Sequence, residues 1–172
     1  MKDSLINYYK NISQYYSSLH NHKEVSAWAG LALHIGFCGL VIGIKAPPSL
    51  ETTFEIILTI ITIIVFILVL LYVRNQLAMK DRAGGLAGAA LLLMTELIGK
   101  RNVNIRSYLT LVASTNTKAQ SEHILPERLI REMEHLNARA TGERNITRSM
   151  IYGLLILSTW SVLVIRWLSI LP

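Results

Sequence analysis

Polar side chains recur at helical spacing within two very apolar stretches of the chain. Residues 54–73 carry one charge and two threonines, and residues 150–171 carry a single arginine. The residues of these two polar stripes are Glu55, Thr59, Thr62, Tyr152, Thr159 and Arg166. Intervals of three, four and seven residues place each set on one face of a helix. Ionisable groups in apolar helices pair with one another or line water, so we predict a pore or polar stripe at these positions.

Each of the two charged residues also has an ordinary structural explanation. Thr52 and Glu55 fit a capping box, which would start a helix near Thr53. Arg166 could extend its guanidinium to the lipid headgroups beside Trp167. Pairing, pore lining and these two structural roles therefore all stay open.

No arrangement of residues typical of an enzyme is present in the sequence. The chain has no phosphate-binding glycine loop, no zinc-protease motif, no paired cysteines and no nucleophile elbow, so we expect neither catalysis nor a cofactor. His20 and His22 lack the acidic or cysteine neighbours that complete a metal site, and no metal is expected. For His34, inside an apolar stretch, we favour a hydrogen bond within packed helices over a functional role.

Three stretches are long and apolar enough to cross a bilayer. Residues 54–73 would cover about 30 Å as a helix, which matches the hydrocarbon core, and residues 27–44 and 150–171 are the other two. Only 16% of the residues are charged, against about a quarter in soluble domains. We therefore predict an all-α membrane protein with three transmembrane helices, the first two joined at Pro47-Pro48 into a hairpin.

Small residues form a stripe on the first span. Ala32, Gly36, Gly39 and Gly43 recur at spacings of four, three and four. Small side chains let two helix backbones approach closely, and such packing drives helix association in lipid. We predict that this stripe is a helix-packing face.

The segments between the spans complete the predicted organisation. Residues 1–26 form an amphipathic N-terminal helix with a tyrosine-rich face, which could bind a lipid surface or pack on protein. Residues 27–73 are the transmembrane hairpin, 74–148 a mostly helical cytosolic region, and 149–172 the third transmembrane helix.

Within the cytosolic region we expect two helices and a polar loop. Leu86–Met94 reads as a separate buried helix that follows Gly84-Gly85 and ends at Gly99. A second helix begins after Pro126 and ends at Gly142. Its predicted ion pairs between positions i and i+4 are Glu127–Arg131 and Arg128–Glu132. The apolar residues on its buried face are Leu129, Ile130, Met133 and Leu136. For residues 105–114 helix and strand stay open, and residues 115–121 form the loop.

The distribution of charge predicts the orientation in the membrane. Residues 74–148 hold 12 of the 17 Lys and Arg residues against seven acidic ones, a balance of 12 minus seven, or +5. Lys and Arg are enriched in cytoplasmic segments, so the N-terminus and this region should lie inside and the C-terminus outside.

Two architectural resemblances narrow the expected function. The tyrosine-rich helix and close hairpin of residues 5–73 resemble the SLATT-type membrane effectors of bacterial defence systems, which implies a pore that senses a nucleotide-type signal. The Leu125-Pro126 helix followed by a last span resembles the small octameric membrane proteins of the RipA-like family. Neither resemblance assigns a role to a particular residue.

We therefore expect a homo-oligomeric pore or ion channel in the bacterial inner membrane. Three helices fill their own centre with side chains, so a water path would need several copies, and self-association is expected. An anionic small molecule or nucleotide would gate it through the cytosolic region, as in antiviral defence. The alternative is a non-conducting scaffold or accessory subunit that anchors a cytosolic protein partner.

Overall fold

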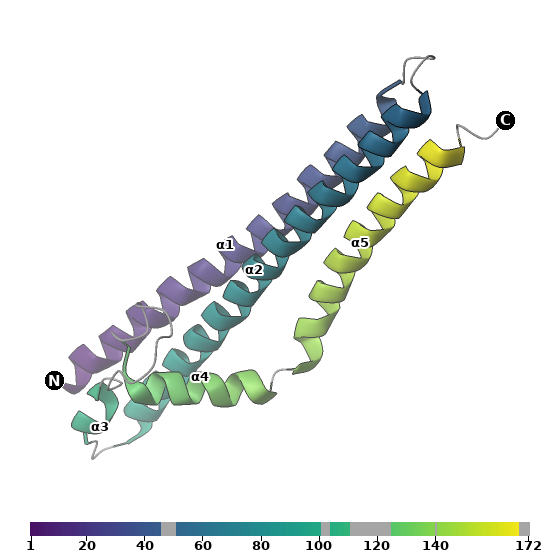
Figure 1. Cartoon of the computed structure of the whole chain (residues 1–172). Helices are drawn as coiled ribbons and strands as arrows, with labels where there is room; N and C mark the ends of the chain where they lie inside the picture. The colour runs from purple at the N-terminus through teal and green to yellow at the C-terminus, as the bar shows by residue number, and fades with distance from the viewer. Residues whose placement is uncertain (46–50, 101–103, 111–124, 140, 169–172) are drawn as a thin grey trace. The chain divides into compact units, whose positions relative to one another are not determined.

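The computed structural model describes residues 1–45, 51–100, 104–110, 125–139 and 141–168, which contain helices and no strand. Figure 1 traces the helices of this part of the chain. In chain order they are α1 (Lys2–Gly43), α2 (Glu51–Gly99), α3 (Arg106–Leu109), α4 (Glu127–Arg139) and α5 (Thr141–Leu168). The connection at Pro47-Pro48, the loop at residues 115–121 and the end of the third predicted span lie outside the described residues.

Three of the described helices, α1, α2 and α5, are long and apolar enough to cross a membrane. Each contains all or most of one of the three predicted spans. The predictions of an all-helical chain and of three helices able to cross a membrane are thus confirmed for the described residues.

Helix α2 runs without interruption through Gly84-Gly85 to Gly99, so the prediction of a separate helix at Leu86–Met94 was wrong. These glycines mark close approaches rather than breaks. A Cβ atom at Gly84 would lie 2.8 Å from Nδ1 of His20, and one at Gly85 would lie 2.5 Å from Oδ1 of Asn137. Both distances are shorter than a van der Waals contact, so neighbouring elements occupy the space that a side chain would need.

Other helix boundaries also differ from the predicted ones. Helix α1 joins the predicted N-terminal helix and the first span in one element, and α2 begins at Glu51, so Thr52 lies inside it and the predicted capping box is wrong. Gly142 lies within α5 and does not end α4. In the undecided stretch of residues 105–114, the described part forms the short helix α3.

The chain divides into two compact units, and each combines segments far apart in sequence. The membrane unit consists of residues 23–78 and 143–172, and the tyrosine-rich unit consists of residues 1–22 and 79–142. Five of the seven tyrosines belong to the second unit, which gives it its name here.

In the membrane unit, the core shows how the three spans run. One cluster joins Ala27 and Leu31 of α1 to Val73 and Leu77 of α2, together with the start of the third span. A second cluster joins Cys38 and Val41 of α1 to Val162 of α5, with Leu58 of α2 packed against it. From the first cluster to the second, the residue numbers rise in α1 and α5 and fall in α2. The three spans alternate in direction.

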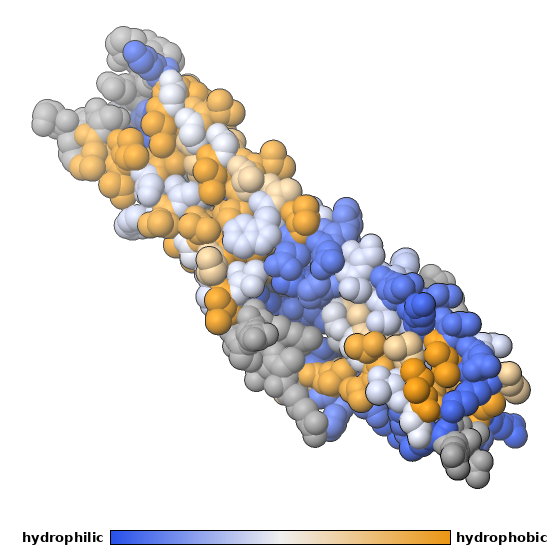
Figure 2. Space-filling view, turned by 180° about the vertical axis from the view of Figure 1, so that it is seen from behind, coloured by the Kyte–Doolittle hydropathy of each residue, from blue (hydrophilic) through white to orange (hydrophobic). Residues whose placement is uncertain are grey.

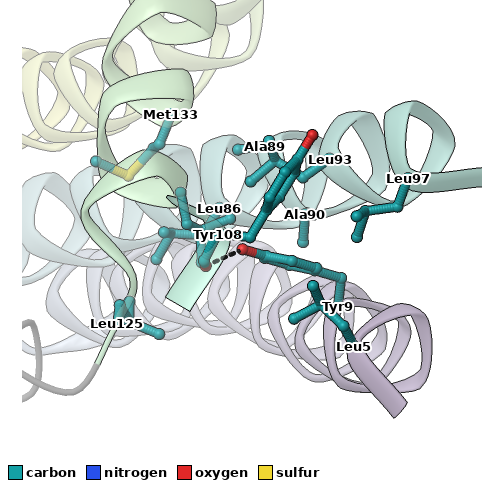
Figure 3. Packing of buried hydrophobic residues seen from close by; sticks show 11 residues of the cluster. Leu5, Tyr9, Leu86, Ala89, Ala90, Leu93, Leu97, Tyr108, Leu125 and Met133 are labelled. Carbon is teal, nitrogen blue, oxygen red and sulfur yellow. Dashed lines mark hydrogen bonds between the residues drawn. The ribbon is translucent and has the colours of Figure 1, made fainter. Parts of the chain in front are cut away.

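Figure 3 shows the core of the tyrosine-rich unit. Tyr9 of α1 is fully buried, and its hydroxyl donates a 2.7 Å hydrogen bond to the backbone carbonyl of Tyr108. The aliphatic residues around this pair come from three helices: Leu5, Leu86, Ala89, Ala90, Leu93, Leu97, Leu129 and Met133. Leu129 and Met133 belong to the predicted apolar face of α4, whose packing is thus confirmed, with Ile130 and Leu136 partly buried beside them.

Two ionic contacts position α4 in this unit. The Arg128 guanidinium lies 2.6 Å from the Glu96 carboxylate and 4.1 Å from the centre of the Tyr108 ring. The predicted Glu127–Arg131 pair is present at 2.7 Å, whereas Arg128 pairs with Glu96 of α2 rather than with Glu132. The Glu96 carboxylate also accepts from Lys100, and these hydrogen bonds, that from Lys100 foremost, lower the pKa of Glu96.

We expect Gly30→Leu to destabilise the membrane unit, whereas Gly153→Leu should not. A Cβ atom at Gly30 would lie 3.1 Å from the ring of Tyr72, while one at Gly153 would meet nothing within 4 Å among the described residues. Overpacking of this kind costs about 1–3 kcal/mol. Thermal unfolding in detergent, followed by circular dichroism, measures the difference, and equal melting temperatures for the two variants would contradict the prediction.

The tyrosine-rich unit should lose stability in alkaline solution. Burial raises the pKa of Tyr9 above the ordinary tyrosine pKa of about 10. The neutral phenol therefore contributes its full stabilisation below about pH 10, and this contribution is lost as the pH rises further. Tyr9→Phe should cost about 1 kcal/mol at pH 7.5, because the Tyr108 carbonyl loses its donor, yet flatten the decline above pH 10. Denaturant titrations at pH 7.5–11 measure both effects, and an unchanged slope in the variant would contradict this assignment.

Candidate functional site

Glu55 of α2 and Arg166 of α5 form an ion pair inside the membrane unit. Nε of Arg166 donates a 2.9 Å hydrogen bond to Oε2 of Glu55, and the guanidinium also donates from Nη2 to Oε1. The two residues are only 3% and 8% exposed. The structure thus brings together the two charges of the predicted stripes, and Arg166 does not extend to the lipid headgroups.

The same guanidinium also binds the end of α1. Its Nη1 donates to the backbone carbonyls of Val41 and Ile44, at the point where α1 ends. The last carbonyls of a helix have no partner within the helix and carry its negative dipole, so a cation there is favourable. One side chain therefore connects all three spans at this end of the unit.

The other predicted stripe residues are also engaged within the chain. Thr59 accepts a 3.2 Å hydrogen bond from the indole nitrogen of Trp167, and the Thr62 hydroxyl donates to the carbonyl of Leu58 at 2.8 Å. Tyr152 is half-buried and packs against the cluster around Ala27. The polar stripes of α2 and α5 therefore face protein rather than an open channel within one chain.

Thr159 contacts a histidine that the sequence analysis did not place in the site. Nε2 of His34 lies 2.8 Å from Oγ1 of Thr159 and 3.5 Å from Sγ of Cys38. The ring of His34 is also 6.1 Å from that of Phe66, so all three spans surround it. The signal was in the sequence: residues 27, 31, 34, 38 and 41 share one face of α1, and this is the face that packs within the chain.

The predicted helix-packing stripe lies on another face of α1. Ala32, Gly36, Gly39 and Gly43 are exposed, and an added Cβ atom at any of the three glycines would meet no described atom within 4 Å. Contact within the chain instead uses Gly30, which the sequence analysis did not single out. The packing role of the stripe stays a prediction that concerns contacts between molecules.

The surface of the membrane unit suits lipid. Figure 2 shows hydrophobic side chains over most of its visible face, in the upper left part of that view. Large aliphatic residues of this unit, among them Leu33, Leu40 and Leu68, are well exposed. The buried charges and the apolar clusters lie inside the unit, and many of its exposed side chains are apolar.

The tyrosine-rich unit contains a polar cavity of about 340 Å³. Its lining residues are Ser107, Thr110, Glu127, Arg128, Arg131 and Glu132. Two arginines and two glutamates leave this lining without net charge, so the cavity does not by itself select an anion. The anionic ligand inferred from the charge of residues 74–148 stays a prediction.

Within the described residues, no three His, Cys, Asp or Glu side chains come together as metal ligands. Comparison with protein-family models, with curated proteins and with solved structures finds no match for this chain. What the site does must therefore be argued from its geometry.

Breaking the Glu55–Arg166 pair on one side should cost more than removing both charges. Arg166→Leu leaves the Glu55 carboxylate buried without its partner, and loss of one member of a buried pair costs about 3–5 kcal/mol. The double variant Glu55→Leu/Arg166→Leu should recover at least half of that loss, because no unpaired charge remains. Unfolding in graded detergent mixtures measures the three proteins, and a double variant as unstable as the sum of two single variants would contradict the pairing.

Proposed function

We propose that the protein is a homo-oligomeric pore of the bacterial inner membrane, with a closed state in which the polar residues of each protomer bind one another. The observation that supports this most is the Glu55–Arg166 pair, buried among three membrane-spanning helices. Charged residues inside a membrane are expensive and are characteristic of ion pathways and gates. A simple anchor would need neither charge.

Opening would require the inner polar groups to exchange partners. In the described arrangement Glu55, Arg166 and Thr59 all have partners within the chain. A rotation of α2 or α5 that separates the pair would turn a carboxylate and a guanidinium toward a shared axis. The pore is thus proposed to open by exposing what each protomer now buries.

Self-association would use the small-residue stripe of α1. Gly36, Gly39 and Gly43 are exposed, and an added Cβ atom at any of them would meet no described side chain within 4 Å, so a second helix could approach the backbone closely. Several copies are needed because three helices leave no room for water.

The orientation and the gating signal complete the proposal. The excess of Lys and Arg in residues 74–148 favours an orientation with the tyrosine-rich unit and the N-terminus inside and the C-terminus outside. A cytosolic anionic or nucleotide signal would bind this basic region and bias the opening, in the manner of an antiviral defence effector.

A second candidate function is a non-conducting scaffold, which one observation favours. In the tyrosine-rich unit, Leu91, Leu92 and Ile98 of α2 are exposed on the side opposite the buried cluster. A helix that is apolar all round normally has neighbours on every side. A cytosolic protein partner on this face would make the chain an anchoring subunit.

Ion flux from liposomes containing the purified protein distinguishes the two functions. Glu55→Gln weakens the pair without changing the size of the side chain. If the pair keeps the pore closed, flux should rise at least about tenfold, because loss of even about 1.4 kcal/mol shifts the equilibrium between closed and open states tenfold. Combining Glu55→Gln with Gly36→Leu should abolish that flux and reduce the particle mass, because the proposed contact between copies is blocked.

Gly153→Leu combined with Glu55→Gln is the matched control, since Gly153 is another exposed membrane glycine but lies outside the stripe. It should leave the raised flux unchanged. Folded proteins that conduct in no variant, and that co-purify with a stoichiometric cytosolic partner, would contradict the pore and support the scaffold.

A further inference from the structure

His34 is a buried ionisable side chain of the membrane unit that neither an ion pair nor the proposed pore accounts for. The side chain is 1% exposed, and it lies ten residues before Ile44, or about 15 Å along α1 from the end that Arg166 binds. This depth corresponds to the middle of a bilayer, where the ring is far from water on either side.

The hydrogen bonds of Thr159 decide which nitrogen of His34 carries the proton. The Thr159 hydroxyl has a single hydrogen, which it donates to the Leu155 carbonyl at 2.8 Å. Its oxygen is therefore left to accept from Nε2 of His34, also at 2.8 Å. The neutral ring thus carries its hydrogen on Nε2, and Nδ1 is the nitrogen that a further proton would occupy.

Nothing described around Nδ1 would stabilise that proton. The atom is buried, and no described protein group lies within hydrogen-bond distance of it. The groups that face the ring are Phe37 and Cys38 from α1, Phe66 from α2 and Thr159 from α5, and none of them carries a charge. The one buried carboxylate of the described unit, Glu55, is held by Arg166.

We propose that His34 is a proton-binding switch whose protonation opens the packing of α1 against α5. The imidazolium would have an unpaired N–H and an uncompensated charge in an apolar interior, which disfavours the packed state alone. A state in which the ring reaches water or a carboxylate binds the proton better, so acid shifts the population toward it. The inference goes beyond the pore proposal, because opening of the packing can occur with or without conduction.

Cys38 provides a direct measurement of this opening. It is the only cysteine in the chain, it is 4% exposed, and its sulfur lies next to the His34 ring. We would measure its labelling by 4,4′-dithiodipyridine, which reacts with thiols in acid as well as at neutral pH, on the full chain in lipid nanodiscs. A Cys38→Ser/Lys45→Cys variant, whose thiol is at an exposed position, gives the reference rate at each pH.

The normalised labelling rate of the wild type should rise between pH 7.5 and pH 5.5. One proton can shift an equilibrium by at most about tenfold per pH unit, so the expected rise is between about threefold and 100-fold. His34→Gln and His34→Asn, which cannot be protonated, should remove the rise, while His135→Gln, at an exposed histidine of α4, should leave it unchanged.

A flat wild-type profile would overturn the proposal without reference to any variant. It would equally be overturned if folded His34→Gln or His34→Asn kept the rise, or if His135→Gln removed it. Because labelling requires no ion flux, a protein that never conducts could still show the switch, so failure of the pore and failure of the switch are separate results.

Discussion

The arrangement of the membrane unit depends on how a guanidinium can be stable among apolar helices. Removing one ion from water costs several kcal/mol even after relaxation, and only complementary groups with good geometry offset that cost. Arg166 finds them on both other spans: the Glu55 carboxylate on α2 and the terminal carbonyls of α1. Because these partners are fixed to the backbones of three helices, the cation sets the register of the spans at this end.

Other polar groups of the unit likewise form hydrogen bonds with partners inside it. The Thr62 and Thr159 hydroxyls donate to carbonyls of their own helices. Trp167 of α5 donates to Thr59 of α2, and His34 of α1 lies within hydrogen-bond distance of Thr159 of α5. The outer face is left to aliphatic side chains and to the small residues of α1. A chain built this way presents many apolar side chains on the surface of its membrane unit and keeps its buried charges paired inside that unit.

Much of the fold follows from local patterns, and the rest depends on contacts that no local pattern contains. The length of each apolar run predicted the three spans, and the spacing of Leu129 and Met133 predicted the buried face of α4. The presence of an ionisable group in each of two apolar runs suggested pairing of Glu55 with Arg166 as one of several possibilities. The glycines were predicted least well. Gly84 and Gly85 suggested a helix boundary, and Gly30 was not singled out. At each of these positions a side chain distant in sequence occupies the space that a Cβ atom would need. The expected hydrogen bond of His34 within packed helices is confirmed, but its partner could not be identified from local sequence because Thr159 lies 125 residues away.

The distance in sequence between Glu55 and Arg166 has a consequence for how the protein is made. The two residues are 111 positions apart, so at roughly 5–20 residues per second a ribosome synthesises the arginine about 5–20 s after the glutamate. During that interval the first two helices hold an acidic group without its counter-ion, and the end of α1 lacks its cation. Only the insertion of α5 supplies the cation that binds both earlier helices, so a nascent chain that stalls before α5 keeps the Glu55 carboxylate and the last carbonyls of α1 without this partner.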